Sequence, residues 1–115
     1  MFKWIDDSQK GYKVMEDHCT GVFYLVVEDC RPNCNGMATI PMVNRDGKPR
    51  TLEKLDEQEQ IIKRVSEYAD GAWEILEDLH TGVLYLVTKG TGGVSITVMI
   101  DKTGKPSLYN EKLQY

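Results

Sequence analysis

The sequence predicts an α+β protein built from two antiparallel β-meander repeats, about three strands each, with one amphipathic helix between them. The chain contains an internal duplication, and each copy carries short β-branched and aromatic segments separated by glycine-containing turns. Between the copies, apolar residues recur with the spacing of one helical face. We expect a single domain over residues 1–115, divided into a first repeat (12–50), a linking helix (51–71) and a second repeat (72–109).

The duplication becomes visible when the chain is shifted by 61 positions. Residues 12–27 (YKVMEDHCTGVFYLVV) and 73–88 (WEILEDLHTGVLYLVT) are identical at eight of sixteen positions. After a loop four residues longer in the first copy, residues 36–49 (GMATIPMVNRDGKP) align with 93–106 (GVSITVMIDKTGKP). A match of this extent, in order and with one gap, indicates a tandem repeat.

Each copy predicts a three-stranded meander. A tight turn from Asp to Gly joins the first two strands, because Asp bonds the backbone ahead of it and Gly accepts a positive φ. The second strand is rich in β-branched and aromatic residues. A Gly-Lys-Pro turn follows the third strand, and its Pro suits a sheet edge because it cannot donate to a ladder. The expected strands are 12–16, 22–27 and 37–43 in the first copy, and 73–77, 83–88 and 94–100 in the second.

Residues 51–71 predict the helix, with Thr51 as N-cap and Gly71 at its end. Its apolar stripe is expected to pack on the sheet, and docking into a partner's groove is the alternative. The stripe consists of Leu52, Leu55, Ile62, Val65 and Ala69. The opposite face is acidic and carries Glu53, Asp56, Glu57, Glu59 and Glu67.

The second strands, 22–27 and 83–87, are apolar at every position, which is typical of strands buried on both faces. One helix covers only one face of a six-stranded sheet. The other face needs either the second copy folded over it as a sandwich layer or another chain. We therefore expect a homo-oligomer.

Composition excludes several classes of function. A net charge of −4 and a pI of about 5.1 disfavour binding to duplex nucleic acid, but they leave room for a small anionic ligand. Asp6 and Asp7 interrupt any secretory signal, and no segment approaches the ~18 apolar residues of a membrane span. We expect a soluble cytoplasmic protein without a membrane partner. The three cysteines fit reduced thiols better than a disulfide framework.

The hairpin and turn motifs also resemble a known family. Residues 77–106 read EDLHTGVLYLVTKGTGGVSITVMIDKTGKP, and the first copy repeats the pattern as TGVFYLV and GKP. This resembles a family of small proteins of unknown function from phages and Firmicutes. Its hallmark is a Thr-Gly-Val-x-Tyr-Leu hairpin, a glycine-containing loop, a hydrophobic strand and an Asp-x-x-Gly-Lys-Pro turn. The first copy departs from it in the loop at 30–35 and at Pro41.

The resemblance implies a biological context but identifies no functional residues. Members of the family usually hold one copy, so this chain resembles a covalently fused dimer with the helix as linker and cover. The family carries no established activity and no site residues to transfer. Small accessory phage proteins often bind and disable a host component or signal. The resemblance implies a similar role here, in the host cytoplasm if the chain is phage-encoded.

Two loops are candidates for binding a ligand. The glycine-rich segment 89–93 can turn backbone N–H groups toward an anion. It does not precede a helix, so it is neither a P-loop nor a dinucleotide fingerprint, and a bulged strand connection is the alternative. The equivalent loop at 30–36 offers a guanidinium that can fork onto a phosphate, and two amides. The candidate ligand residues are Arg31, Asn33, Asn35, Lys89, Thr91, Gly92 and Gly93. About a pseudo-twofold axis these loops either converge or lie at opposite ends, and the sequence leaves both arrangements open.

A zinc site is the metal alternative, because His18, Cys19, Cys30 and Cys34 all fall in the first copy. The first two precede the second strand and the last two follow it. Eight strand residues span about 26 Å at ~3.3 Å each, so the two pairs are expected at opposite ends. Ordinary buried thiols are the simpler interpretation. We expect no metal and no cofactor.

Catalytic residues are not expected either. The pairs Glu16-Asp17 and Glu77-Asp78 could serve acid–base chemistry, but Asp at a turn is better explained as a backbone cap. His18 and His80 occupy different turn positions, and no nucleophile stands beside a His and a carboxylate.

The sequence thus favours a non-enzymatic, phage-type accessory (anti-defence) binding protein. Its sharpest form is a sponge that sequesters a nucleotide-derived signalling molecule. The alternative is a protein–protein interaction module that inhibits a host protein or has a structural role.

Overall fold

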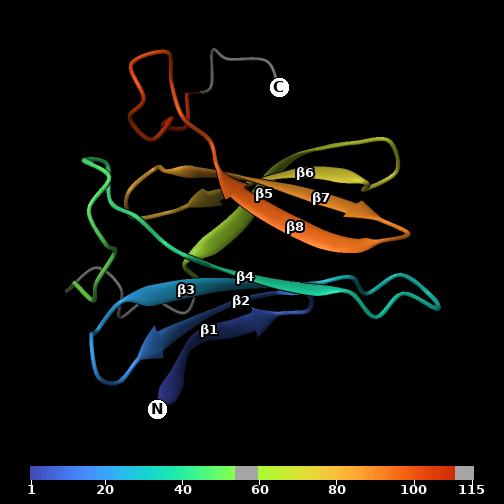
Figure 1. The fold of residues 1–115 in the computed structure, drawn as a ribbon, viewed down its shortest axis with the longest axis horizontal. Helices are drawn as coiled ribbons and strands as arrows, with labels where there is room; N and C mark the ends of the chain where they lie inside the picture. Colours follow the sequence, from blue (N-terminus) through green and yellow to red (C-terminus); the bar gives the residue numbers. More distant parts are fainter. Residues whose placement is uncertain (54–59, 111–115) are drawn as a thin grey trace.

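The structure is a computed structural model that describes residues 1–53 and 60–110. These residues form two four-stranded antiparallel sheets, of order β1-β2-β3-β4 and β5-β6-β7-β8, and contain no helix (Figure 1). The protein is all-β, so the predicted α+β class is wrong. No helix able to cross a membrane is present in this described part. The strands are β1 (Phe2–Gln9), β2 (Tyr12–Asp17), β3 (Phe23–Glu28), β4 (Met37–Pro41), β5 (Ile62–Tyr68), β6 (Trp73–Asp78), β7 (Leu84–Gly90) and β8 (Gly93–Val98).

The C-terminal part of the segment predicted as a helix is strand β5, which pairs with β6. Ala69, the last residue of the predicted apolar stripe, has a φ of 52° in the turn that follows. The helix-like step from Ile62 to Val65 is explained by a bulge between Arg64 and Ser66, which adds one residue to a strand of period two. Pairing with β6 supplies the backbone hydrogen bonds that a helix makes internally. Residues 54–59 of the predicted helix, with Leu55, Asp56, Glu57 and Glu59, lie outside the described residues.

Each repeat has four strands, and the prediction of about three is corrected accordingly. β1 pairs with β2 as β5 pairs with β6, and a bulge interrupts both pairings at equivalent positions. With a shift of 60 instead of 61, Lys3 aligns with Lys63 and Gly11 with Gly71. Gly11 and Gly71 have φ values of 92° and 87° in equivalent turns. These matches are the signal by which the sequence could have revealed the extra strand.

The remaining strands repeat one another in register. Met15 lies opposite Tyr24 across β2 and β3, and the equivalent Leu76 lies opposite Tyr85 across β6 and β7. The Asp-to-Gly turns between these strands hold their glycines at φ values of 76° and 77°. The two copies of the repeat therefore fold into the same four-stranded unit.

The two sheets pack front to back, so that unlike faces meet. Alternate residues of a strand point to opposite faces of the sheet. The first sheet turns inward the face that carries Leu25, whereas the second turns inward the face that carries Tyr85. Tyr24, the equivalent of Tyr85, points outward. The buried core comprises Val14, Phe23, Leu25, Val27 and Met42 from the first repeat, and Ile61, Ile62, Leu76, Val83, Tyr85 and Val87 from the second.

This stacking places equivalent parts of the repeats at the same end of the molecule, as in a solenoid. The sheets approach most closely where β4 lies beside β8, in the middle of the view in Figure 1. The arrangement is not a pseudo-twofold, because a twofold axis between the sheets would bring like faces together.

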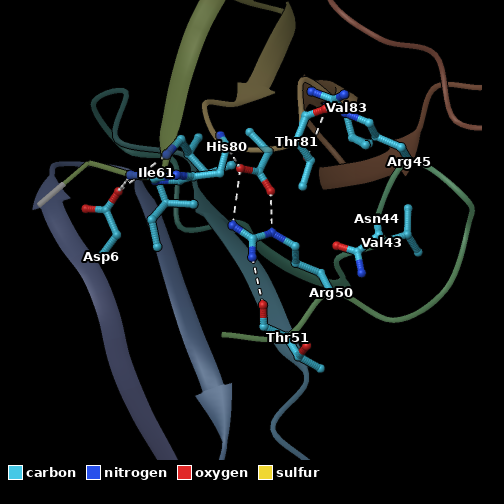
Figure 2. A network of polar contacts seen from close by, with 12 residues as sticks. Asp6, Val43, Asn44, Arg45, Arg50, Thr51, Ile61, His80, Thr81 and Val83 are labelled. Atoms are coloured by element: carbon cyan, nitrogen blue, oxygen red, sulfur yellow. Dashed lines mark hydrogen bonds and ion pairs between the residues drawn. The ribbon is translucent and has the colours of Figure 1, made fainter. Parts of the chain in front are cut away.

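Buried polar contacts hold the sheets in this register. Arg50 Nε lies 2.7 Å from Asp78 Oδ2 with both side chains fully buried, and Arg50 Nη1 donates to the Thr51 carbonyl at 2.8 Å. Asp6 Oδ2 accepts from the backbone N–H of Ile61 at 2.6 Å (Figure 2). Each of these buried groups finds its partner only in this arrangement of the two sheets. A shift of one sheet relative to the other would therefore leave buried polar groups unsatisfied.

Candidate ligand-binding site

The two loops chosen from the sequence meet at one end of the stacked sheets. The first connects β3 to β4, and the second is a tight hairpin between β7 and β8 in which Gly90 lies opposite Gly93. A Cβ placed on Gly36 would lie 3.0 Å from the Cα of Gly93, the glycine at the equivalent position. No larger residue fits at this approach without a backbone shift, so glycine there allows the loops to converge.

A cleft opens between these loops, and we call it the loop cleft. Its volume is about 230 Å³, and a second hollow of about 260 Å³ adjoins it and shares four of its lining residues. The first loop contributes five residues to the loop cleft and the second hairpin contributes three. They are Asp29, Asn33, Cys34, Asn35 and Gly36, with Gly90, Thr91 and Gly93. Together the hollows are large enough for a ligand of nucleoside size.

Asp29 organises the first loop. Its side chain is 1% exposed, and its Oδ1 accepts from the backbone N–H of Arg31 at 3.1 Å. Arg31 Nη2 lies 2.7 Å from Asp29 Oδ2, and Nε lies 2.9 Å from Oδ1. Hydrogen bonds from this guanidinium lower the pKa of Asp29 to about 2. Arg31 is therefore held as half of an ion pair, with its side chain 39% exposed at the rim of the loop.

Lys89 points away from the loop cleft. Its side chain is 10% exposed and pairs with Glu74 Oε1, and its Nζ lies 5.4 Å from the centre of the Tyr12 ring. Tyr12 donates its hydroxyl to Glu74 Oε2, and burial followed by this bond raises the pKa of Tyr12. Lys89 shares a face of β7 with Tyr85, so it lies between the sheets. Gly92 is exposed and does not line the cleft.

The loop cleft thus brings together Asn33, Asn35, Thr91 and Gly93 of the predicted residues, with Arg31 beside them. These groups offer carboxamides, a hydroxyl and backbone N–H and C=O groups. Among the residues that line the cleft, Asp29 carries the formal charge, and Arg31 neutralises it. The cleft is suited to a polar group of low charge, such as a base or a sugar, with a cationic side chain at its edge.

The cysteines and the turn aspartates, the other candidate residues from the sequence, lie in ordinary structural positions. In the described residues, the three cysteines are free and no group of three His, Cys, Asp or Glu residues is placed to hold a metal. Asp17 Oδ1 accepts from the Cys19 N–H at 2.9 Å, and Asp78 Oδ1 accepts from the His80 N–H at 3.0 Å. Both aspartates therefore cap the turns that follow them.

A second cleft, the turn cleft, lies at the opposite end of the molecule (Figure 1), and Figure 2 shows Asn44, Arg45, His80 and Thr81 from its lining. It has a volume of about 460 Å³, and the Arg50–Asp78 ion pair lies nearby. Arg45 Nε donates to the Thr81 carbonyl across it at 2.5 Å. Its lining residues are Asn44, Arg45, Asp46, Glu53, His80 and Thr81. Apart from Glu53, they come from the Gly-Lys-Pro turn of one repeat and the Thr-Gly turn of the other, so only the stacking reveals this cleft.

Comparison with known families supports the unit seen in the structure. Residues 59–109 match a family described as a family of unknown function (DUF6440). The match covers a little under half of the chain and spans all four strands of the second sheet, β5 to β8. Comparisons with curated proteins and with solved structures gave no match. The second repeat is therefore similar to an uncharacterised domain family.

Proposed function

We propose that this protein is a non-enzymatic binding protein that holds a small polar ligand, of the nucleotide class, in the loop cleft. The observation that carries the proposal is the convergence of equivalent loops from both repeats on one hollow, at Gly36 and Gly93. Loops held by a rigid sheet are common binding elements. The Asp29 bonds to Arg31 keep the longer of the two loops in one conformation.

The chemistry of the cleft suggests which part of a nucleotide lies where. The amides of Asn33 and Asn35 can each donate to and accept from the edge of a base. Thr91 and the glycine backbone can bond a ribose or a phosphate oxygen. Arg31, already oriented by Asp29, can bond a phosphate at the rim. Recognition of this kind requires fixed hydrogen bonds and no catalytic group.

The biological role that we propose is sequestration. A protein that removes a signalling nucleotide from solution needs affinity and abundance, not turnover. The resemblance of the hairpin and turn motifs to proteins from phages and Firmicutes supports an accessory, anti-defence role inside a host cell.

A panel of nucleosides, mononucleotides and cyclic oligonucleotides, read by thermal shift and then calorimetry, tests the proposal. A ligand present at 100 times its dissociation constant stabilises the folded state by about 2.7 kcal/mol, which is a shift of roughly 10 °C for a chain of this size. The Asn33→Gly/Asn35→Ala variant should lose the shift. Glycine is chosen at position 33 because the φ there is 62°. If no panel member stabilises the protein at millimolar concentration, the proposal is wrong.

The turn cleft is a second candidate location, and its larger volume favours it. Arg45→Ala serves as the matched variant because it removes a polar side chain from that cleft and leaves the loop cleft unchanged. Binding that survives Asn33→Gly/Asn35→Ala and disappears in Arg45→Ala would assign the ligand to the turn cleft instead.

A further inference from the structure

We propose that the protein self-associates head to tail, with the outer face of the first sheet of one chain docked on the outer face of the second sheet of the next. The contact would repeat between chains the front-to-back contact that already joins the two repeats within a chain. This inference concerns a surface separate from the loop cleft and is independent of the proposed ligand.

The outer face of the first sheet carries several exposed apolar side chains, and we call it the apolar outer face. Phe2 and Trp4 are 54% and 49% exposed. The rings of Phe2 and Tyr24 meet edge to face with centroids 6.1 Å apart, and Lys13 Nζ lies 5.2 Å from the centre of the Trp4 ring. Its apolar residues are Phe2, Trp4, Met15, Tyr24, Val26 and Pro41, of which Met15 and Tyr24 are half-buried and Val26 is buried. A surface of this composition is typical of an interaction site.

The structure itself shows what covers such a face. In the second sheet, the residues equivalent to Phe2, Met15, Tyr24 and Val26 are Ile62, Leu76, Tyr85 and Val87, and all four are fully buried against the first sheet. The occupant of this face within the chain is thus another copy of the same four-stranded unit. A second chain is the source of such a unit for the apolar outer face.

The outer face of the second sheet, here the distal face, is equivalent to the inward face of the first sheet. It carries the exposed aromatic pair Tyr68 and Trp73, which are 42% and 44% exposed and lie opposite one another on β5 and β6. Leu86 is half-buried beside Ile75, which is already covered within the chain. Leu84 of the same face is likewise fully buried within the chain, so Tyr68, Trp73 and Leu86 supply the apolar area that Phe2, Trp4 and Tyr24 would contact.

The polar contacts between the repeats also have counterparts between chains. Within the chain, Tyr12 donates to Glu74 between the sheets. In the contact between chains, the position of Tyr12 is taken by Trp73 on the distal face and that of Glu74 by Lys13 on the apolar outer face. Trp73 and Lys13 are suited to a cation–π contact. The buried pair of Glu74 and Lys89 is mirrored, with signs exchanged, by Lys13 and Glu28 on the apolar outer face.

At the turns, Arg45 donates to the Thr81 carbonyl within the chain. In the contact between chains, Lys102 takes the place of Arg45 and Thr20 that of Thr81, so a cation again faces a carbonyl group. The position of Arg50 is taken by Ser107 and that of Asp78 by Asp17. The contact between chains therefore has a hydrogen bond where the contact within the chain has a stronger, buried ion pair. The contact between chains is therefore weaker than the contact within the chain, and assembly is expected to be reversible.

Unlike faces in contact give a heterologous interface, which continues from chain to chain until it closes into a ring or is limited by affinity. Sedimentation velocity and light scattering from about 5 to 500 µM, a range set to span typical weak association, should show a mass that rises from 13.1 kDa with concentration. A wild-type chain that stays monomeric over this range overturns the proposal and leaves the apolar outer face to a different partner.

Two variants test the geometry. Trp4→Glu disables the apolar outer face and Trp73→Glu disables the distal face, so each variant alone should be monomeric. Mixed in equal amounts, they should form a heterodimer and stop there, because each supplies the one intact face that the other lacks. The matched control is Leu79→Glu, which places the same charge on a residue that is 42% exposed in a turn outside both faces. It should associate like the wild type.

The competing geometry is a back-to-back dimer of two apolar outer faces. In that case Trp73→Glu dimerises alone and the mixture forms no heterodimer, which would refute head-to-tail assembly. If either tryptophan variant fails to fold by circular dichroism, Phe2→Glu and Tyr68→Glu replace them, because these residues occupy the same two faces.

Discussion

The buried ion pair between Arg50 and Asp78 allows a quantitative test of the stacking. Both side chains are fully buried, and Arg50 also lies 4.9 Å from the centre of the Phe23 ring. Asp78→Ala would leave a buried guanidinium without its carboxylate, and loss of one partner from such a pair costs about 3–5 kcal/mol. For a chain of this size, that corresponds to a fall of roughly 12–20 °C in the unfolding midpoint.

The duplication supplies the matched control. Asp17 occupies the equivalent turn and makes the equivalent bond, since both aspartates accept from a backbone N–H two residues ahead. Asp17→Ala should therefore cost much less than Asp78→Ala, because it removes exposed hydrogen bonds and leaves no charge buried. The difference between the two variants isolates the ion pair from the turn cap.

Urea denaturation of these two variants, of Arg50→Met and of the double variant Arg50→Met/Asp78→Ala completes the cycle. The double variant should be more stable than Asp78→Ala alone, because no unpaired charge remains buried. Equal losses for Asp78→Ala and Asp17→Ala, or strictly additive effects in the double variant, would refute the assignment of Arg50 and Asp78 as the tie between the sheets.

Tyr85→Phe should lower the free energy of unfolding by about 1–3 kcal/mol, because the buried Tyr85 hydroxyl accepts from the Val43 N–H at 3.0 Å. Tyr24→Phe, at the equivalent position that points outward, should be nearly neutral in the same urea titration. Gly36→Ala should cost about 1–3 kcal/mol, since its Cβ meets the Gly93 backbone at 3.0 Å, whereas Gly90→Ala, with nothing within 4 Å, should have little effect. Arg31 lowers the pKa of Asp29 from 3.8 to about 2, so its stabilising effect is complete above pH 3.8 and is lost as the pH falls toward 2. A carboxyl NMR titration should show the pKa of Asp29 rising in Arg31→Ala, and an unchanged pKa would contradict this.

Much of the candidate site could be predicted from the sequence. The direction in which the Lys89 side chain points could not. The loops were chosen for their glycines, amides and cation, and Asn33, Asn35, Thr91 and Gly93 do lie together. Lys89 was grouped with them because it is adjacent in the chain. The strand period places it on the face of Tyr85, where Glu74 pairs with it between the sheets. The partner of a buried charge lies far away in the sequence, so no local pattern revealed it.

The helix prediction failed for a related reason. Between Ile62 and Val65 the spacing of apolar side chains is the same for a helix and for a strand with a bulge, and Ala69 lies in the turn that follows. Long-range pairing decides between them, because β6 offers Ile62 and its neighbours a full set of backbone partners. The alignment of Lys3 with Lys63, and of Gly11 with Gly71, could have shown that this segment repeats the N-terminal one.

Sequence alone determined the duplication and the turns of each copy, because a positive φ or a capped N–H is a local requirement that only a few residues meet. The tertiary structure alone decided which face of each sheet became the interior. Both faces of β3 and of β7 are apolar enough to be buried, so the choice depended on contacts between the sheets. Arg50 opposite Asp78, and Asp6 opposite the Ile61 N–H, are satisfied only when the repeats stack front to back.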